Sequence, residues 1–436
     1  MKKLTAILAL VLCCMMAFLG CAQPAATPAA AAPAAGDAPA AADAPAAADA
    51  GKTIVYWSMW ESTEPQGQVI QQAIDAFVAN TGIQVDVQFK GRTGIREGLQ
   101  PALDAGTVID MFDEDIDRIN TTFNAYLYNL EELAAANDYE ATANAGLMAA
   151  CRESAGGQLL SIPYQPNVFA FFYNKDIFNK AGVSAVPTTW AEFLDVCQKI
   201  KDAGFTPITC DDAYIDCMIG YHMARLGGEQ AVRDIVTNGT WDDPIVLQMA
   251  KDYEELATKG YFSANLASNV WPSGQNGEFA LGEVGMYLNG SWLPNEVRSI
   301  TGDEFLWGCF SYPALEGGKT GVEASNFGAQ VFAINKDSQV APEAFQLITW
   351  LTKGEWDKAL ADGSLGIPAD TSNTEWPTQL SEVAPVLGSL TTRYTWAAGV
   401  EANVDMTPVI KENFTKLCGG AMTAQEFVDA MIAAAK

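Results

Sequence analysis

Strand and helix patterns alternate along the sixty residues that follow Lys52, and this alternation restricts the fold more than any other feature. The run KTIVYWSMW (52–60) has the β-branched and aromatic character of a buried strand. A helical spacing of apolar residues follows over 66–81, then an alternating strand (84–90), a helix (96–106) and a short strand (108–112). This order predicts right-handed βαβ units on a parallel sheet, where ligands bind beyond the carboxyl ends of the strands.

Polar and aromatic residues stand where these strands are expected to end. Trp60 and Glu61 follow the first strand, and Glu114, Asp115 and Asp117 follow the third. The acidic run 113–117 has carboxylates at alternate positions, as a calcium loop does, but it lacks the glycine and the final glutamate of that loop. We therefore predict no metal site and keep the carboxylates as candidates for binding ligand hydroxyls.

The N-terminal fifty residues have the plan of an export signal and a tether. Lys2 and Lys3 precede an uncharged apolar run that is shorter than the ~20 residues of a membrane-spanning helix, so residues 1–20 are predicted to be a signal peptide. Gly20-Cys21 is similar to the lipobox of bacterial lipoproteins, although Phe18 stands where leucine is usual. Residues 21–51 are rich in Ala and Pro and lack side chains to bury, which predicts a lipidated Cys21 on an extended tether. The alternative is a plain secretory signal with an incidental cysteine.

Length and charge narrow the class of protein. About 385 residues follow the tether, which is more than one ordinary core holds and suggests two domains. The net charge of -28 disfavours nucleic acid and anionic lipid as partners. Six cysteines follow Cys21 without any C-x-x-C pair, and only Cys210 and Cys217 are close enough in sequence to suggest a bridge.

Two central segments carry a family resemblance. The first is VFAFFYNKDIFNKAG (168–182), followed by PTTWAEF (187–193), in which Thr188 or Thr189 is expected to cap a helix with Glu192 in a capping box. The second is GEFALGEVGMYLNGSWLPNEV (277–297). Together with 310–321 and 325–352, these segments closely resemble the extracellular solute-binding proteins of ABC importers, specifically the family that takes up maltose and other sugars.

The resemblance implies an α/β, two-lobed periplasmic-binding-protein-like fold with the ligand cleft between the lobes. Chain crossings are expected near Pro166, Phe310 and Gly354, so that residues 52–166 and about 310–353 form lobe 1. Residues 167–309 and about 354–436 then form lobe 2. The implied protein is a monomer without cofactor, anchored at the extracellular face of the membrane, which passes a carbohydrate to an ABC permease.

A sugar site needs flat aromatic faces to stack on and planar polar groups for paired hydrogen bonds. In the resemblance Trp292 holds the family's sugar-stacking position, the alternative being a ring that closes the cleft edge. Asn289 is expected to donate to a hydroxyl or to stabilise its turn, and Gln165 to touch ligand from the hinge or to cap backbone. Looser candidates in predicted loops are Arg92, Asp211, Asp212, Trp271, Asn326, Arg393 and Trp396.

Two other functions stay open. A secreted glycosidase would also carry aromatic residues and paired carboxylates, but the resemblance is to a non-catalytic family. The same fold could instead bind a polyamine, a peptide or another small solute. Acidic loops rich in Trp would suit a polyamine, but the sugar-type central motifs outweigh this. Other chemistry is disfavoured because His222 is the sole histidine and stands at helical spacing, and because no nucleophile elbow, zinc motif or P-loop occurs.

Overall fold

The protein is described here by a computed structural model that covers residues 51–302 and 304–436. The predicted signal peptide, Cys21 and nearly all of the tether lie outside these residues. No helix within the described residues is long and apolar enough to span a membrane.

Nine strands form one sheet that runs through the described part of the chain. Seven of them follow the order β2-β1-β3-β8-β4-β6-β5, while β7 pairs with β4 and β9 with β8. Their bounds are β1 (Thr53–Ser58), β2 (Gln84–Phe89), β3 (Met111–Asp115), β4 (Ile162–Asn174), β5 (Thr206–Thr209), β6 (Val284–Gly290), β7 (Trp307–Phe310), β8 (Ala324–Ile334) and β9 (Thr392–Tyr394). β1 pairs in parallel with both β2 and β3, which confirms the βαβ start expected from the sequence.

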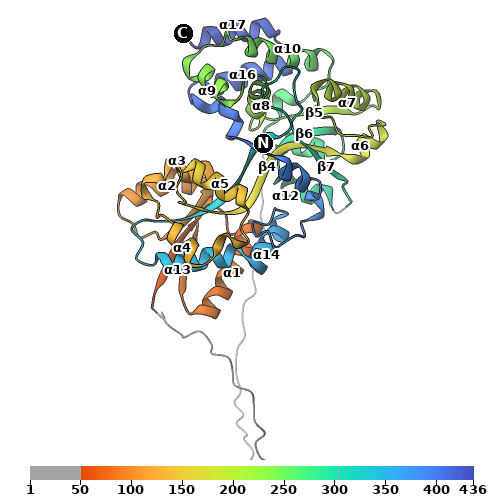
Figure 1. The fold of residues 1–436 in the computed structure, drawn as a ribbon. Coiled ribbons are helices and arrows are strands. Elements are labelled where there is room, and N and C mark those ends of the chain that lie inside the picture. The colour runs from red at the N-terminus through yellow and green to blue at the C-terminus, as the bar shows by residue number, and fades with distance from the viewer. Residues whose placement is uncertain (1–50, 303) are drawn as a thin grey trace, which may run out of the picture. The chain divides into compact units, whose positions relative to one another are not determined.

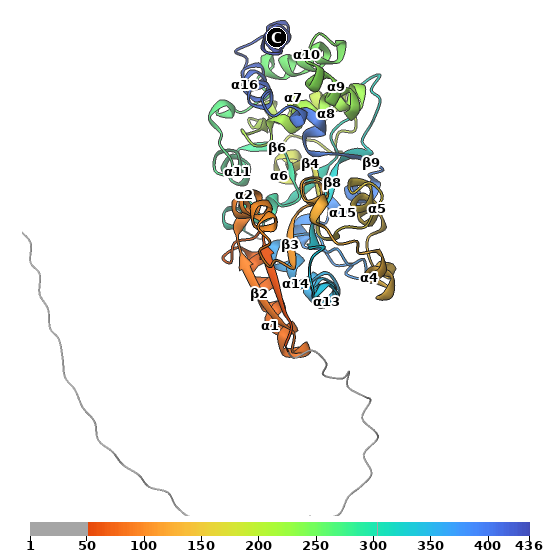
Figure 2. The same cartoon turned by 90° about the vertical axis from the view of Figure 1, so that its left-hand side faces the viewer.

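Two separate hydrophobic cores divide the described chain into two lobes. Each lobe has its own set of helices (Figure 1). The first core draws its buried residues from 54–164 and 329–360, and the second from 168–324 and 367–431. In Figure 2, β2 forms the outer edge of the sheet in the first lobe and α1 lies beside it. The helices of the first lobe are α1 (Pro65–Thr81), α2 (Gly91–Asp104), α3 (Ile116–Thr122), α4 (Glu131–Ala136), α5 (Ala145–Ser154), α13 (Ala341–Thr352) and α14 (Gly354–Ser364).

The second lobe holds the remaining α-helices of the described chain. They are α6 (Lys175–Lys180), α7 (Trp190–Asp202), α8 (Ile215–Gly227), α9 (Glu229–Asn238), α10 (Pro244–Thr258), α11 (Gly274–Ala280), α12 (Leu293–Thr301), α15 (Val383–Ser389), α16 (Thr407–Cys418) and α17 (Ala424–Ala434). Short 3-10 turns are η1 (Asn124–Tyr126), η2 (Tyr139–Ala141), η3 (Leu266–Ser268), η4 (Thr378–Leu380) and η5 (Trp396–Ala402).

Local signals in the sequence explain where several of these helices begin and end. Thr189 caps α7, and its hydroxyl and the Glu192 carboxylate form the predicted capping box. α1 buries Ile70, Ile74 and Phe77 on one face and ends at Gly82, whose φ of 77° is one that glycine adopts without strain.

One expectation about the chain needs correction. The third strand was expected to end at Phe112, but β3 continues to Asp115, so Glu114 and Asp115 lie within the strand's end rather than after it. Buried tyrosine hydroxyls satisfy Asp113 there, which lets an acidic run continue the strand. Cys210 and Cys217, whose pairing the sequence left open, are both free, buried thiols.

The residues that belong to each core also indicate where the chain passes from one lobe to the other. β4 contributes Tyr164 to the first core and Val168 to the second, close to the crossing expected near Pro166. Tyr312 and Ala324 belong to the second core, whereas Leu360 still belongs to the first. We therefore propose that the second crossing lies within β8 and the third between Leu360 and Ile367, instead of near Phe310 and Gly354.

Candidate functional site

An aromatic cluster in the second lobe brings together residues from four segments of the chain. We use this term for Phe169, Tyr214, Trp292 and Trp396. The rings of Trp292 and Trp396 are inclined by 23° with centroids 6.4 Å apart, and Phe169 lies 5.4 Å from Trp396 and 5.4 Å from Tyr214. The indole Nε1 of Trp292 donates a hydrogen bond to the Tyr214 hydroxyl at 3.1 Å. Two sequence-predicted tryptophans that are 104 positions apart therefore meet, each only partly buried.

The position of Trp292 depends on a glycine. Trp292 follows β6, and its indole folds back over Gly290, where a Cβ atom would stand 2.3 Å from two ring carbons. Only glycine leaves room for the ring at this place. The turn of sequence NGSW thus fixes the direction of the aromatic side chain.

Trp396 is held by an unusual backbone. It opens η5, and the next three residues, Ala397, Ala398 and Gly399, have φ values of 48°, 47° and 89°. Left-handed conformations cost energy in alanine, and they persist where the surrounding packing dictates them. Here the α8 helix packs so closely that a Cβ on Gly220 would meet the Ala397 carbonyl oxygen at 1.9 Å.

Carboxylates flank the aromatic cluster. Asp211 follows β5 and accepts hydrogen bonds from the backbone N–H of Ala213 and Tyr214 at 2.7 and 2.8 Å, and from the hydroxyl of Tyr287. Burial raises the pKa of Asp211, although these hydrogen bonds oppose the shift. The neighbouring Asp212 is exposed and accepts from the backbone N–H of Trp271 at 2.9 Å.

Trp271 and Glu296 complete this part of the site. Trp271 is 42% exposed in the loop before α11. Glu296, on α12, lies one helical turn after Trp292 and accepts from the side-chain amide of Asn276 at 2.9 Å. Burial raises the pKa of Glu296 to about 7. Sequence reasoning missed Glu296, and its i+4 spacing from Trp292 was the signal that could have indicated it.

Trp60 in the first lobe is buried rather than open. Its indole Nε1 donates to the Tyr164 hydroxyl at 2.8 Å, and the guanidinium of Arg92 covers its ring at 4.7 Å. Tyr164 in turn donates to Asp113, whose pKa is raised to about 7 by burial. Glu61 is exposed, and its backbone N–H donates to Glu64 at 2.8 Å.

The carboxylates at the end of β3 have partners of their own. Glu114 is fully buried and accepts two hydrogen bonds from Arg96, both at 3.1 Å. Asp115 caps α3, and burial raises its pKa to about 6. Asp117 pairs with Arg393 at 2.8 Å. Within the described residues, no group of three or more His, Cys, Asp or Glu side chains is arranged to hold a metal ion.

Three predicted amides have different surroundings. Gln165 has a φ of 45° at a register shift in β4, donates to the Ser364 hydroxyl at 3.2 Å, and has a buried Oε1 without a partner in the described structure. Asn289 accepts from Gly290 at 2.6 Å, and its buried Nδ2 is likewise without a partner there. Asn326 donates to the Tyr394 carbonyl at 2.9 Å and so ties β8 to β9.

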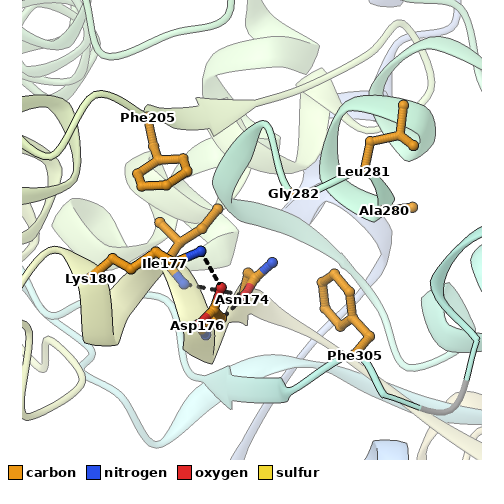
Figure 3. A pocket seen from close by; sticks show the side chains of 9 residues that line it. All are labelled: Asn174, Asp176, Ile177, Lys180, Phe205, Ala280, Leu281, Gly282 and Phe305. Carbon is orange, nitrogen blue, oxygen red and sulfur yellow. Dashed lines mark hydrogen bonds and ion pairs between the residues drawn. The ribbon is translucent and has the colours of Figure 1, made fainter.

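A surface pocket of about 230 Å³ lies elsewhere in the second lobe (Figure 3). The side chains of Phe205 and Phe305 stand on either side of it, and the Asn174 amide oxygen at its base accepts from the backbone of Asp176 and Ile177. Asp176 is also paired with Lys180 at 2.5 Å. None of the sequence-predicted site residues lines this pocket, so the candidate site remains at the aromatic cluster.

Comparison with known families decides what kind of protein this is. Residues 60–358 match the family model of bacterial extracellular solute-binding proteins. The chain belongs to this family. That membership confirms the resemblance noted in the two central segments, and the matched family is one of binding proteins.

Relatives of this solute-binding protein match it over part of their length. The diacetylchitobiose-binding protein NgcE of Streptomyces coelicolor is 27% identical over 236 residues, which is 50% of this chain and 49% of the relative. The sn-glycerol-3-phosphate-binding periplasmic protein UgpB of Agrobacterium fabrum is 46% identical, but over 50 residues, or 11% of this chain and 12% of the relative. The chain spans about half the length of several curated relatives it matches.

Solved structures of solute-binding proteins share the fold of the whole described chain. The apo form of RafE from Streptococcus pneumoniae has a TM-score of 0.70 at 20% identity, covering 88% of this chain and 97% of that chain. A chitin oligosaccharide binding protein has a TM-score of 0.68 at 18% identity, covering 88% and 98%. These likenesses confirm the two-lobed α/β fold expected from the sequence.

Proposed function

We propose that the protein captures a carbohydrate at the aromatic cluster, between its two lobes, and delivers it unchanged to an ABC permease. The observation that carries this proposal is the pair formed by Trp292 and Trp396, two partly exposed indoles beside Asp211 and Glu296. Aromatic faces bind the apolar side of a sugar ring, and neighbouring carboxylates accept hydrogen bonds from its hydroxyls. The names of NgcE and of the RafE complex with raffinose, which refer to carbohydrates, support the same ligand class.

The proposal includes the place of the protein in the cell. We infer that the lipobox-like Gly20-Cys21 carries a lipid anchor and that residues 21–51 let a monomer reach its permease in the same membrane. The sequence of this segment supports the inference, because the segment cannot bury enough apolar surface to fold. Diacyl anchoring would be stable because each buried methylene contributes about 0.8 kcal/mol.

A thermal-shift panel tests the ligand class. The protein should melt several degrees higher with one of raffinose, chitobiose or xylobiose, since a ligand at about 100 times its dissociation constant stabilises by about 2.7 kcal/mol. The Trp292→Ala variant, melted with the same sugars, is the matched control and should show little shift. A panel in which no carbohydrate moves the melting temperature would contradict the proposal.

The glycosidase alternative is tested with the same sugar. After incubation with the protein, the sugar should be recovered intact by chromatography, because the proposed role is binding. New reducing ends that are absent with boiled protein would identify an enzyme.

A further inference from the structure

Glu296 lies beside the aromatic cluster. Its backbone N–H donates to the Trp292 carbonyl at 3.2 Å, which puts its side chain on the same side of α12 as the indole. Burial, and after it the negative charge of Glu296, raises the pKa of Tyr214, whose hydroxyl accepts a hydrogen bond from the Trp292 indole. The side chain of Glu296 also accepts from the amide of Asn276 at 2.9 Å. Glu296 is therefore placed to meet a ligand bound at the cluster.

No basic side chain neutralises the carboxylates beside the cluster. Within residues 51–302 and 304–436, no lysine or arginine forms an ion pair with Glu296, Asp211 or Asp212. The two arginines predicted for the site are already engaged. Arg92 pairs with Glu64 at 2.9 Å, and Arg393 pairs with Asp117 at 2.8 Å and donates to the Phe327 carbonyl.

This arrangement favours one class of ligand. An anionic ligand would lose its hydration beside acceptor groups of its own sign, and the two arginines predicted for the site, Arg92 and Arg393, are already paired with carboxylates. A sugar hydroxyl, in contrast, supplies the donor that a carboxylate needs and brings no charge.

We propose that Glu296 binds the ligand at the aromatic cluster and restricts the site to uncharged polyhydroxy solutes, against anionic ones such as phosphate esters. This inference rests on the proposed function and assigns its ligand class and one specificity residue. At pH 8, above the pKa of about 7 to which burial raises Glu296, most of its population is ionised. The carboxylate then accepts a charge-assisted hydrogen bond from a sugar hydroxyl that the neutral amide of glutamine cannot replace.

Calorimetric titration of the protein and of two variants tests the proposal. The probes are raffinose, chitobiose and xylobiose as neutral ligands, sn-glycerol 3-phosphate as the anion, and spermidine as the cation. Glu296→Gln keeps the size of the side chain and removes its charge, while Glu283→Gln changes an exposed glutamate of the same lobe and is the matched control. Urea melts without ligand should show Glu296→Gln at least as stable as the wild type at pH 8, since it removes a buried carboxylate without an ion-pair partner.

We expect one of the neutral sugars to bind and Glu296→Gln to weaken that binding roughly tenfold or more. Glu283→Gln should leave the sugar affinity unchanged, and sn-glycerol 3-phosphate should give no saturable heat. Unchanged sugar affinity in Glu296→Gln would overturn the role of Glu296. Binding of sn-glycerol 3-phosphate or spermidine as tight as the best sugar would overturn the ligand class while leaving a solute-binding protein. Failure of every sugar would overturn the proposed function itself, and this inference with it.

Discussion

Trp292 is the residue on which the proposed site depends most. A core tryptophan replaced by alanine leaves a cavity that costs about 3–5 kcal/mol of stability. Trp292 is only partly buried, so we expect Trp292→Ala to cost less than that. Sugar affinity should instead fall by roughly 1.5–3 kcal/mol, about ten- to two-hundredfold.

Trp241 supplies the control for that prediction because its side chain is fully buried in the second core. Trp241→Ala should show the full loss of stability in a urea melt and, under conditions where it remains folded, normal sugar affinity. If Trp292→Ala behaves like Trp241→Ala, Trp292 is a core residue and not a ligand platform.

Gly290 offers an independent test of the same ring. A Cβ at this position would stand 2.3 Å from the indole carbons of Trp292, so Gly290→Ala must displace the ring. We expect Gly290→Ala to weaken sugar binding about as much as Trp292→Ala, and the double variant to lose nothing further. Gly98→Ala, where no heavy atom lies within 4 Å, is the control and should be stabilised by about 0.5–1 kcal/mol. Additive losses in the double variant would mean that Gly290 acts on something other than Trp292.

Among the secondary-structure elements, β4 has an irregular point at which the effect of a substitution on ligand binding can be distinguished from its effect on stability. Gln165 sits there with a φ of 45°, which glycine would adopt without strain. In Gln165→Gly the relief of strain, about 1 kcal/mol, offsets the lost hydrogen bond to Ser364, so the free energy of unfolding should stay within about 1 kcal/mol of the wild type. Sugar affinity should fall, because the unpartnered Oε1 of Gln165 is removed.

Asp138→Gly is the matched control for Gln165→Gly. Asp138 has a φ of 48° but is exposed directly before η2 in the first lobe, away from the cluster. Glycine there should raise stability slightly and leave sugar affinity unchanged. An affinity of Gln165→Gly equal to that of the wild type would give Gln165 a purely structural role.

Some elements could be predicted from the sequence because their signals are local. The capping box of Thr189 and Glu192 and the glycine that ends α1 involve residues a few positions apart. The end of β3 could not be predicted, because Asp113 is satisfied in the strand by the hydroxyls of Tyr56 and Tyr164 and by the backbone N–H of Met59, all of which are distant in sequence. Local patterns do not contain such partners.

The candidate site shows the same limit. Trp292 was indicated by its position after an apolar strand and by family resemblance, and the structure places it beside the predicted Trp396. Glu296 was missed although its i+4 spacing from Trp292 is a local signal, because its partner Asn276 belongs to another element, α11. Glu114 was expected to be free for ligand, yet Arg96 from α2 binds both of its oxygens. Tertiary contacts determine which carboxylates are already paired within the protein.

At the scale of the whole molecule, stability should depend on pH in an unusual direction. Burial raises the pKa of five carboxyls, to about 7 for Asp113, Asp216 and Glu296 and to about 6 for Asp115 and Asp357. In the unfolded chain such groups lose their protons near pH 4. Between about pH 5.5 and pH 7, where carboxyls with a lowered pKa such as Glu131 and Asp370 are ionised in both states, these five bind more protons in the folded protein than in the unfolded chain. Stability therefore decreases as the pH rises through this range. The net charge of -28 acts in the same direction.

Urea unfolding at pH 5.5, 6.5 and 8, at constant ionic strength, measures this effect. We expect the free energy of unfolding to be greatest at pH 5.5 and lowest at pH 8, and Glu296→Gln to reduce that difference. Burial lowers the pKa of His222, so this residue makes the protein more stable as the pH rises up to about 6.5 and opposes the trend. The five carboxyls with a raised pKa should outweigh this single histidine. A protein that becomes more stable from pH 5.5 to pH 8 would show that these carboxyls are ionised in the folded state.

The most direct test of the central claim is a calorimetric titration of the wild-type protein with the sugar that gives the largest thermal shift. The account predicts one saturable site per chain, with a negative heat-capacity change as apolar surface of the ring and the indoles is buried. The sugar should be recovered chemically unchanged from the calorimeter cell after the titration. A protein that melts cooperatively but gives no saturable heat with any carbohydrate of the panel would contradict the account.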